Sequence, residues 1–169
     1  MKIHRIVPVL AAVILLGAGC ASVGTAPTTS TAQPANPTKV TSPTGSNAVD
    51  LSNQNLTKVP ESVFGQTGTQ ELNLSNNQLT GAIPAEIRQL KKLRVLNASN
   101  NNMTGVPAEI GQLSNLEVLD LSNNQLTGLP YELGNLQNLK TLNLSGNDIS
   151  GQDLQIILEK LPESVDVIR

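Results

Sequence analysis

Leucines recur along residues 47–162 at a nearly fixed interval, within the phrase LxLxxNxL. In each copy they alternate with polar residues over a few positions, which predicts a short strand with one buried face. A proline-led segment of the form PxEIxxLxxL follows in most copies and predicts a short helix whose apolar residues return to the core. Equivalent positions are spaced 23, 24, 23 and 23 residues apart, namely Leu51, Leu74, Ala98, Leu121 and Leu144. The period predicts about five strand–helix units that bury their apolar faces only by stacking.

An asparagine stands after the strand in each of the last four copies, where the chain has to turn. Its side-chain amide both donates and accepts, so stacked asparagines are expected to bond backbone groups in the turns above and below. Gln54 takes this place in the first copy, which has no preceding turn to serve. The predicted ladder consists of Asn77, Asn101, Asn124 and Asn147.

Side chains between the strand leucines are expected to point away from the core, onto an open sheet face. Three columns follow from the repeat: Ala48, Glu71, Val95, Val118 and Thr141; Asp50, Asn73, Asn97, Asp120 and Asn143; and Ser52, Ser75, Ser99, Ser122 and Ser145. Asn and Ser are also the ordinary filler of such repeats, and this reading stays open.

The pair Val95 and Val118, beside Asp120, departs from that filler and gives a small apolar centre ringed by polar groups, which is the layout of a modest interface. Aromatic and arginine hot-spot residues are absent from the columns, so weak or avidity-assisted binding is expected. The candidate partner-binding residues are Glu71, Asn73, Val95, Asn97, Val118, Asp120, Thr141 and Asn143.

The two ends of the chain differ from the repeats, which we place at residues 47–149. At the carboxyl end, Ser150 to Asp153 fits a capping box, the apolar residues of 154–161 follow at helical spacing, and residues 165–168 predict a last strand. Residues 150–169 are therefore expected to form a cap. At the amino end, Lys2 and Arg5 precede the apolar run 6–16, which is too short for a membrane span and indicates a secretory signal peptide, residues 1–19.

The junction after this signal is similar to the lipobox of bacterial lipoproteins, on Ala18, Gly19 and Cys20, although Gly17 stands where that pattern favours leucine. The resemblance implies export across the cytoplasmic membrane and a diacylglycerol on the Cys20 thiol. Because Ala21 is not the aspartate that retains many such proteins at the inner membrane, it also implies the outer membrane or cell surface. Residues 21–46, rich in Ser, Thr and Pro, predict a disordered stalk that follows the lipid anchor.

Residues 47–162 closely resemble the leucine-rich repeat family, with wording such as LTGxIP and PAEIG that is nearest to its plant-type and short bacterial-type repeats. The resemblance implies an α/β solenoid with a parallel sheet on the concave side and short helices on the convex side. It also implies a typical activity, which is binding another protein.

The amino-acid composition limits which functions the chain is expected to perform. The 11 basic and 13 acidic residues give a formal charge of −2, which provides no field for nucleic acid. His4 is the only histidine and Cys20 the only cysteine, so the usual nucleophile–base pairs are missing and neither an enzyme nor a cofactor is expected.

Two further features of the sequence each have two interpretations. The basic run Arg88, Lys91, Lys92 and Arg94 is either a solvated face or a lipid-phosphate contact, and Tyr131 is either part-exposed or a partner anchor.

Two functions remain open at this point. The first is a membrane-tethered, extracytoplasmic, non-catalytic and monomeric module that binds a protein ligand on its concave surface. The second is a structural or adhesive cell-envelope component that binds glycan or peptidoglycan. The absence of aromatic residues from the strands argues against the second, since aromatic rings commonly stack on sugars.

Overall fold

The computed structural model describes residues 47–169. The signal segment, Cys20 and the stalk predicted from the sequence lie outside the described residues. No helix within residues 47–169 is long and apolar enough to cross a membrane.

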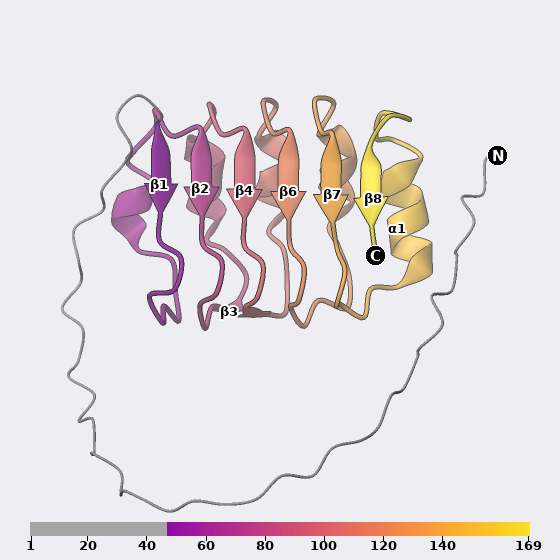
Figure 1. Ribbon diagram of the computed structural model, residues 1–169. Coiled ribbons are helices and arrows are strands. Elements are labelled where there is room, and N and C mark those ends of the chain that lie inside the picture. Colours follow the sequence, from indigo (N-terminus) through magenta and orange to yellow (C-terminus); the bar gives the residue numbers. More distant parts are fainter. Residues whose placement is uncertain (1–46) are drawn as a thin grey trace, which may run out of the picture. The chain divides into compact units, whose positions relative to one another are not determined.

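Six short parallel strands form one sheet, in the order β1-β2-β4-β6-β7-β8, and they stand in a row in Figure 1. Each strand comes from a successive repeat, and the last comes from the end of the chain. Their bounds are β1 Ala48–Asp50, β2 Glu71–Asn73, β4 Val95–Asn97, β6 Val118–Asp120, β7 Thr141–Asn143 and β8 Asp166–Ile168. Two further short strands pair in parallel beyond the turns, β3 Thr80–Gly81 and β5 Asn102–Met103.

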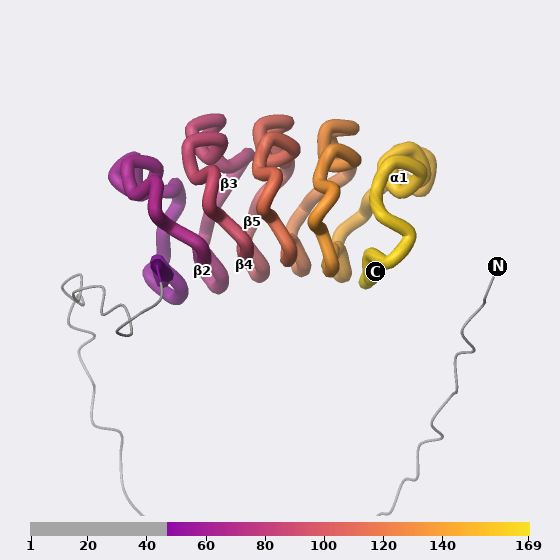
Figure 2. The backbone as a smooth tube through the Cα atoms, turned by 90° about the horizontal axis from the view of Figure 1, so that it is seen from above, coloured from indigo at the N-terminus to yellow at the C-terminus, as the bar shows by residue number. Residues whose placement is uncertain are grey.

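Helices line the side opposite the sheet, so that sheet and helices form the two faces of a solenoid (Figure 2). Four are 3-10 helices: η1 Glu61–Val63, η2 Ala85–Gln89, η3 Ala108–Gln112 and η4 Tyr131–Asn135. Each follows a proline and consists of about one turn closed by i→i+3 bonds, such as Ile87 N–H to the Pro84 carbonyl at 3.1 Å. The predicted fold class is confirmed.

A single column of leucines and isoleucines fills the space between sheet and helices. The strand residues Leu72, Leu96, Leu119 and Leu142 are at most 1% exposed, and Ala98 is fully buried where other repeats have leucine. Removing apolar area from water is the main stabilising term, and each repeat obtains it only from its neighbours. The stack is therefore the folding unit.

The turn after each strand requires a left-handed backbone, and the sequence supplies residues that tolerate it. Asn76, Asn100 and Asn123 have φ of 55°, 54° and 52°, and Gly146 takes the equivalent place in the last repeat with φ of 72°. Asparagine and glycine are the residues that adopt this conformation at least cost.

The chain ends in the predicted helix and strand, α1 Gly151–Leu158 and β8. Leu154, Ile157 and Leu161 of this region are buried against the last repeat, where α1 packs beside η4. The predicted capping box is wrong, because the Ser150 side chain makes no capping hydrogen bond. The carboxylate of Asp153 lies instead beside Gly128 of the preceding repeat.

Candidate functional site

The asparagine ladder connects each repeat to the one before it. In Asn124, Nδ2 donates to the Leu121 carbonyl of its own turn and to the Ala98 carbonyl of the preceding turn, each at 3.0 Å. Its Oδ1 accepts the Met103 N–H at 3.0 Å. Equivalent bonds are made by Asn77, Asn101 and Asn147.

These bonds run in one direction only. Each side chain serves its own turn and the preceding turn, whereas the sequence predicted bonds to both neighbours. Consecutive asparagines nevertheless share acceptors, since the Leu121 carbonyl takes a bond from Asn124 and another from Asn147. The direction fits Gln54 in the first repeat, which has no earlier described turn to bond. The ladder is therefore structural and unavailable to a ligand.

The predicted outward columns lie in register across the sheet. Ala48, Glu71, Val95, Val118 and Thr141 pair in sequence, and so do Asp50, Asn73, Asn97, Asp120 and Asn143. Strand β8 extends both columns, with Asp166 and Ile168. All eight candidate partner-binding residues are thus brought onto one face, where they are half-buried or exposed.

Three of the five serines in the serine column are buried, which corrects the expectation for Ser75, whereas Ser52 and Ser145 are half-buried. Ser75, Ser99 and Ser122 are only 6%, 7% and 5% exposed. The strands end at Asn73, Asn97 and Asp120, so the in–out alternation stops there and the following serines enter the turn. The Ser122 hydroxyl donates to Asp120 Oδ1 at 2.6 Å.

The Asp/Asn column is partly structural. In all five repeats its Oδ1 accepts the backbone N–H two residues later, which closes a local turn at the strand end. The other polar atom of each side chain, Oδ2 in aspartate and Nδ2 in asparagine, is bonded in some repeats and not in others. Asp120 Oδ2 and Asn143 Nδ2 bond each other at 3.2 Å. Asp50 Oδ2 and the Nδ2 atoms of Asn73 and Asn97 have no hydrogen-bond partner among the described residues.

A hollow of about 400 Å³ and another of about 310 Å³ lie on or beside this face. The smaller one, which we call the sheet hollow, is formed by the outward side chains and backbone of β1, β2 and β4: Ala48, Val49, Asp50, Glu71, Leu72, Asn73, Val95 and Asn97. Four candidate residues line it, namely Glu71, Asn73, Val95 and Asn97. The other four lie on β6 and β7, outside it.

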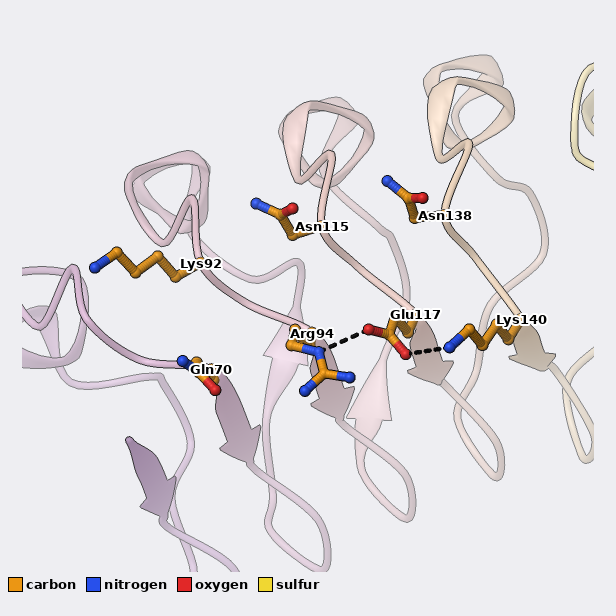
Figure 3. Close-up of a pocket in the computed structure, with 7 residues that line it drawn as sticks. All are labelled: Gln70, Lys92, Arg94, Asn115, Glu117, Asn138 and Lys140. Atoms are coloured by element: carbon orange, nitrogen blue, oxygen red, sulfur yellow. Dashed lines mark hydrogen bonds and ion pairs between the residues drawn. The ribbon is translucent and has the colours of Figure 1, made fainter. Parts of the chain in front are cut away.

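The larger one, which we call the rim pocket, lies where the strands begin and is lined by Gln70, Lys92, Arg94, Asn115, Glu117, Asn138 and Lys140. Glu117 is at its centre (Figure 3). Its Oε1 accepts Arg94 Nε and its Oε2 accepts Lys140 Nζ, both at 2.6 Å. These hydrogen bonds, from Arg94 first and then Lys140, lower the pKa of Glu117 to about 2.

Sequence reasoning missed the rim pocket. It grouped Arg94 with Arg88, Lys91 and Lys92, which are its neighbours along the chain. The structure pairs it instead with Glu117, which is 23 residues away in the next repeat. The available signal was the position before each strand, where Arg94, Glu117 and Lys140 alternate in charge.

Tyr131 is 48% exposed on η4. No group of three metal-binding side chains occurs within the part of the chain that the structure describes.

Comparison with known families and structures gives consistent matches. A family profile described as "Leucine rich repeat" matches residues 47–103, and one described as "Leucine Rich repeats (2 copies)" matches residues 91–131 and 114–156. Together they span residues 47–156. No curated protein matches the chain significantly.

Three solved structures illustrate the similarity. A leucine-rich repeat protein of Leptospira interrogans is 43% identical with a TM-score of 0.63, over 67% of this chain and 28% of that one. A chain of the BIR3–SERK2 complex from Arabidopsis thaliana is 37% identical with a TM-score of 0.56, over 61% and 57%. The ectodomain of the receptor kinase SOBIR1 from Arabidopsis thaliana is 31% identical with a TM-score of 0.57, over 71% and 65%. The chain thus spans between about a quarter and two thirds of these structures.

Proposed function

The chain belongs to the leucine-rich repeat family, and on that premise we propose that it is a membrane-tethered, extracytoplasmic protein-binding module without catalytic activity. The lipid on Cys20 holds it at the outer membrane or cell surface, and residues 21–46 form the stalk. The module acts as a monomer and binds its protein ligand on the sheet face.

One observation carries the proposal. The sheet face presents outward columns in register, together with a hollow in which Asp50 Oδ2 and the Nδ2 atoms of Asn73 and Asn97 have no hydrogen-bond partner among the described residues. Polar atoms without a hydrogen-bond partner, next to small apolar side chains, suit a protein ligand, because a protein supplies both polar and apolar groups. The similar chain from the BIR3–SERK2 complex comes from an assembly of two proteins, which is consistent with this use of the fold.

The anchor is supported by the sequence. A single acyl chain binds a protein to a membrane only marginally, whereas two acyl chains hold the protein firmly. A diacylglyceryl group on Cys20 would therefore tether the protein stably. A role in binding glycan or peptidoglycan is the weaker candidate, because the polar columns lack the aromatic rings on which sugars stack.

Capture experiments on envelope extracts test the proposal. Val118→Arg places a large cation on the sheet face, whereas Gln112→Arg places the same cation at the end of η3 as a matched control. Asp120 is left unchanged, because its Oδ1 holds both the N–H and the hydroxyl of Ser122. We expect capture of a protein partner to be lost in Val118→Arg only and to survive glycosidase treatment of the extract. Capture that Gln112→Arg abolishes and Val118→Arg leaves intact would refute the assignment to the sheet face.

A further inference from the structure

We propose that the sheet hollow receives a lysine or arginine side chain from an extended segment of the bound protein. The proposal rests on the proposed function and names the chemistry of the partner. Its first support is the charge of the sheet face. The outward strand positions carry Asp50, Glu71, Asp120 and Asp166 and no lysine, arginine or histidine. An acidic face with no base of its own is complementary to a basic segment.

The hollow concentrates this complementarity at one place. Glu71 is exposed, its carboxylate makes no hydrogen bond or ion pair among the described residues, and the residue pairs in register with Ala48 on one side and Val95 on the other. Asp50 uses Oδ1 to accept the Ser52 N–H at 3.0 Å, which leaves Oδ2 open. A lysine or arginine side chain has an aliphatic stem and a charged head. Ala48 and Val95 suit the stem, and the two carboxylates suit the head.

The two amides of the hollow suit the backbone of the same segment. Asn73 and Asn97 are half-buried, and their Oδ1 atoms are engaged by the N–H groups of Ser75 and Ser99. Their Nδ2 donors therefore remain for a carbonyl of the segment. These donors lie on adjacent strands in register. An extended chain crossing the strands can place its carbonyls against them.

The rim pocket explains why Glu71 stays available. Arg94 attracts the Glu71 carboxylate electrostatically, but its Nε is held by Glu117 at 2.6 Å. Lys140 is held by the same carboxylate. Glu117 thus keeps both cations at the rim, and the hollow keeps its acidic character. On β6 and β7, in contrast, Asp120 and Asn143 satisfy each other, so the hollow is the part of the face best prepared for a cation.

A random-peptide library tests the proposal. The full chain, purified in detergent, is panned against short random peptides at low ionic strength, and the affinities of recovered peptides are then measured. We expect enrichment in lysine and arginine over the input library. Replacing that residue by norleucine, which keeps the stem and removes the charge, should weaken binding about tenfold or more.

Variants of the protein complete the test. Glu71→Gln should weaken the same peptides about as much as norleucine does, and the two changes together should cost little more than either alone. Glu163→Gln, an exposed acid after α1, is the matched control and should change nothing. Glu71→Lys should shift the selected peptides towards acidic residues.

The outcomes separate this proposal from the proposed function. Peptide binding that Val118→Arg abolishes but Glu71→Gln leaves unchanged would overturn the proposal that the hollow receives a basic side chain. Binding at the sheet face would still stand. Peptides that neither variant affects would count against both. Recovery of no peptide, or of peptides without basic enrichment, would overturn the proposal made here.

Discussion

Truncation of a ladder asparagine is the sharpest test of how the repeats are held together. Asn124→Ala removes a buried amide, 8% exposed, that donates to the Ala98 and Leu121 carbonyls and accepts the Met103 N–H. The two carbonyls keep a second donor, since Asn101 also bonds Ala98 and Asn147 also bonds Leu121. Only the Met103 N–H, in a residue 1% exposed, is left without a partner.

The expected cost follows from that count. One buried donor left unsatisfied costs about 1–3 kcal/mol, so Asn124→Ala should lower the free energy of unfolding by about 2 kcal/mol. Three buried polar groups left unsatisfied would cost several times as much. They do not arise, because the Ala98 and Leu121 carbonyls each keep a second donor. Against a typical domain stability of about 5–15 kcal/mol, the variant should fold but be clearly weakened.

Urea unfolding of the full chain, followed by circular dichroism, measures the change. Asn138→Ala is the matched control, because that exposed amide makes one bond, to the Ser114 carbonyl at 2.8 Å. It should cost less than about 0.5 kcal/mol. The reasoning is refuted if Asn138→Ala costs as much as Asn124→Ala, or if Asn124→Ala leaves the unfolding midpoint unchanged.

Three further predictions follow from other parts of the chain. Metabolic labelling with a fatty acid should mark the wild-type protein and not Cys20→Ala; equal labelling of both would disprove the lipid anchor. Glu117 has its pKa lowered from 4.5 to about 2, so its ionised form stabilises the fold above pH 4.5 and that contribution is lost as the pH falls through about 2. The difference in urea midpoint between wild type and Glu117→Gln should therefore be present at pH 7 and vanish near pH 2; a constant difference would contradict the ion pairs. Gly111→Ala should cost about 1–3 kcal/mol, because a Cβ there would lie 2.6 Å from the Glu132 carbonyl carbon, while Gly128→Ala meets only an ordinary contact at 3.6 Å and should be tolerated.

The sheet was predictable because the repeat itself determines it. Once Leu74 and Leu121 are recognised as equivalent, the register of every strand between them follows, and the structure reproduces residue by residue the two predicted columns that lie within the strands. The turn was less predictable. In–out alternation applies only to extended backbone, and the strands are three residues long. Ser75, Ser99 and Ser122 follow the strands, so the alternation does not apply to them, and they are buried.

The sites were only half predictable for a related reason. The sequence indicated the outward residues but not which side-chain atoms the turns would use, and it therefore centred the interface on Val118 and Asp120. In the structure Asp120 is engaged by Ser122 and Asn143, while the open atoms lie around Glu71. Contacts between neighbouring repeats decide this difference, and a reading along the chain does not contain them.

Binding at the sheet face is the central claim, and crosslinking in living cells tests it most directly. A photo-crosslinking residue is placed at position 118 on the sheet face and, separately, at position 112 at the end of η3. We predict that position 118 yields a discrete crosslinked protein, which Val95→Arg removes, and that position 112 does not. A discrete product from position 112 with none from position 118 would contradict the account.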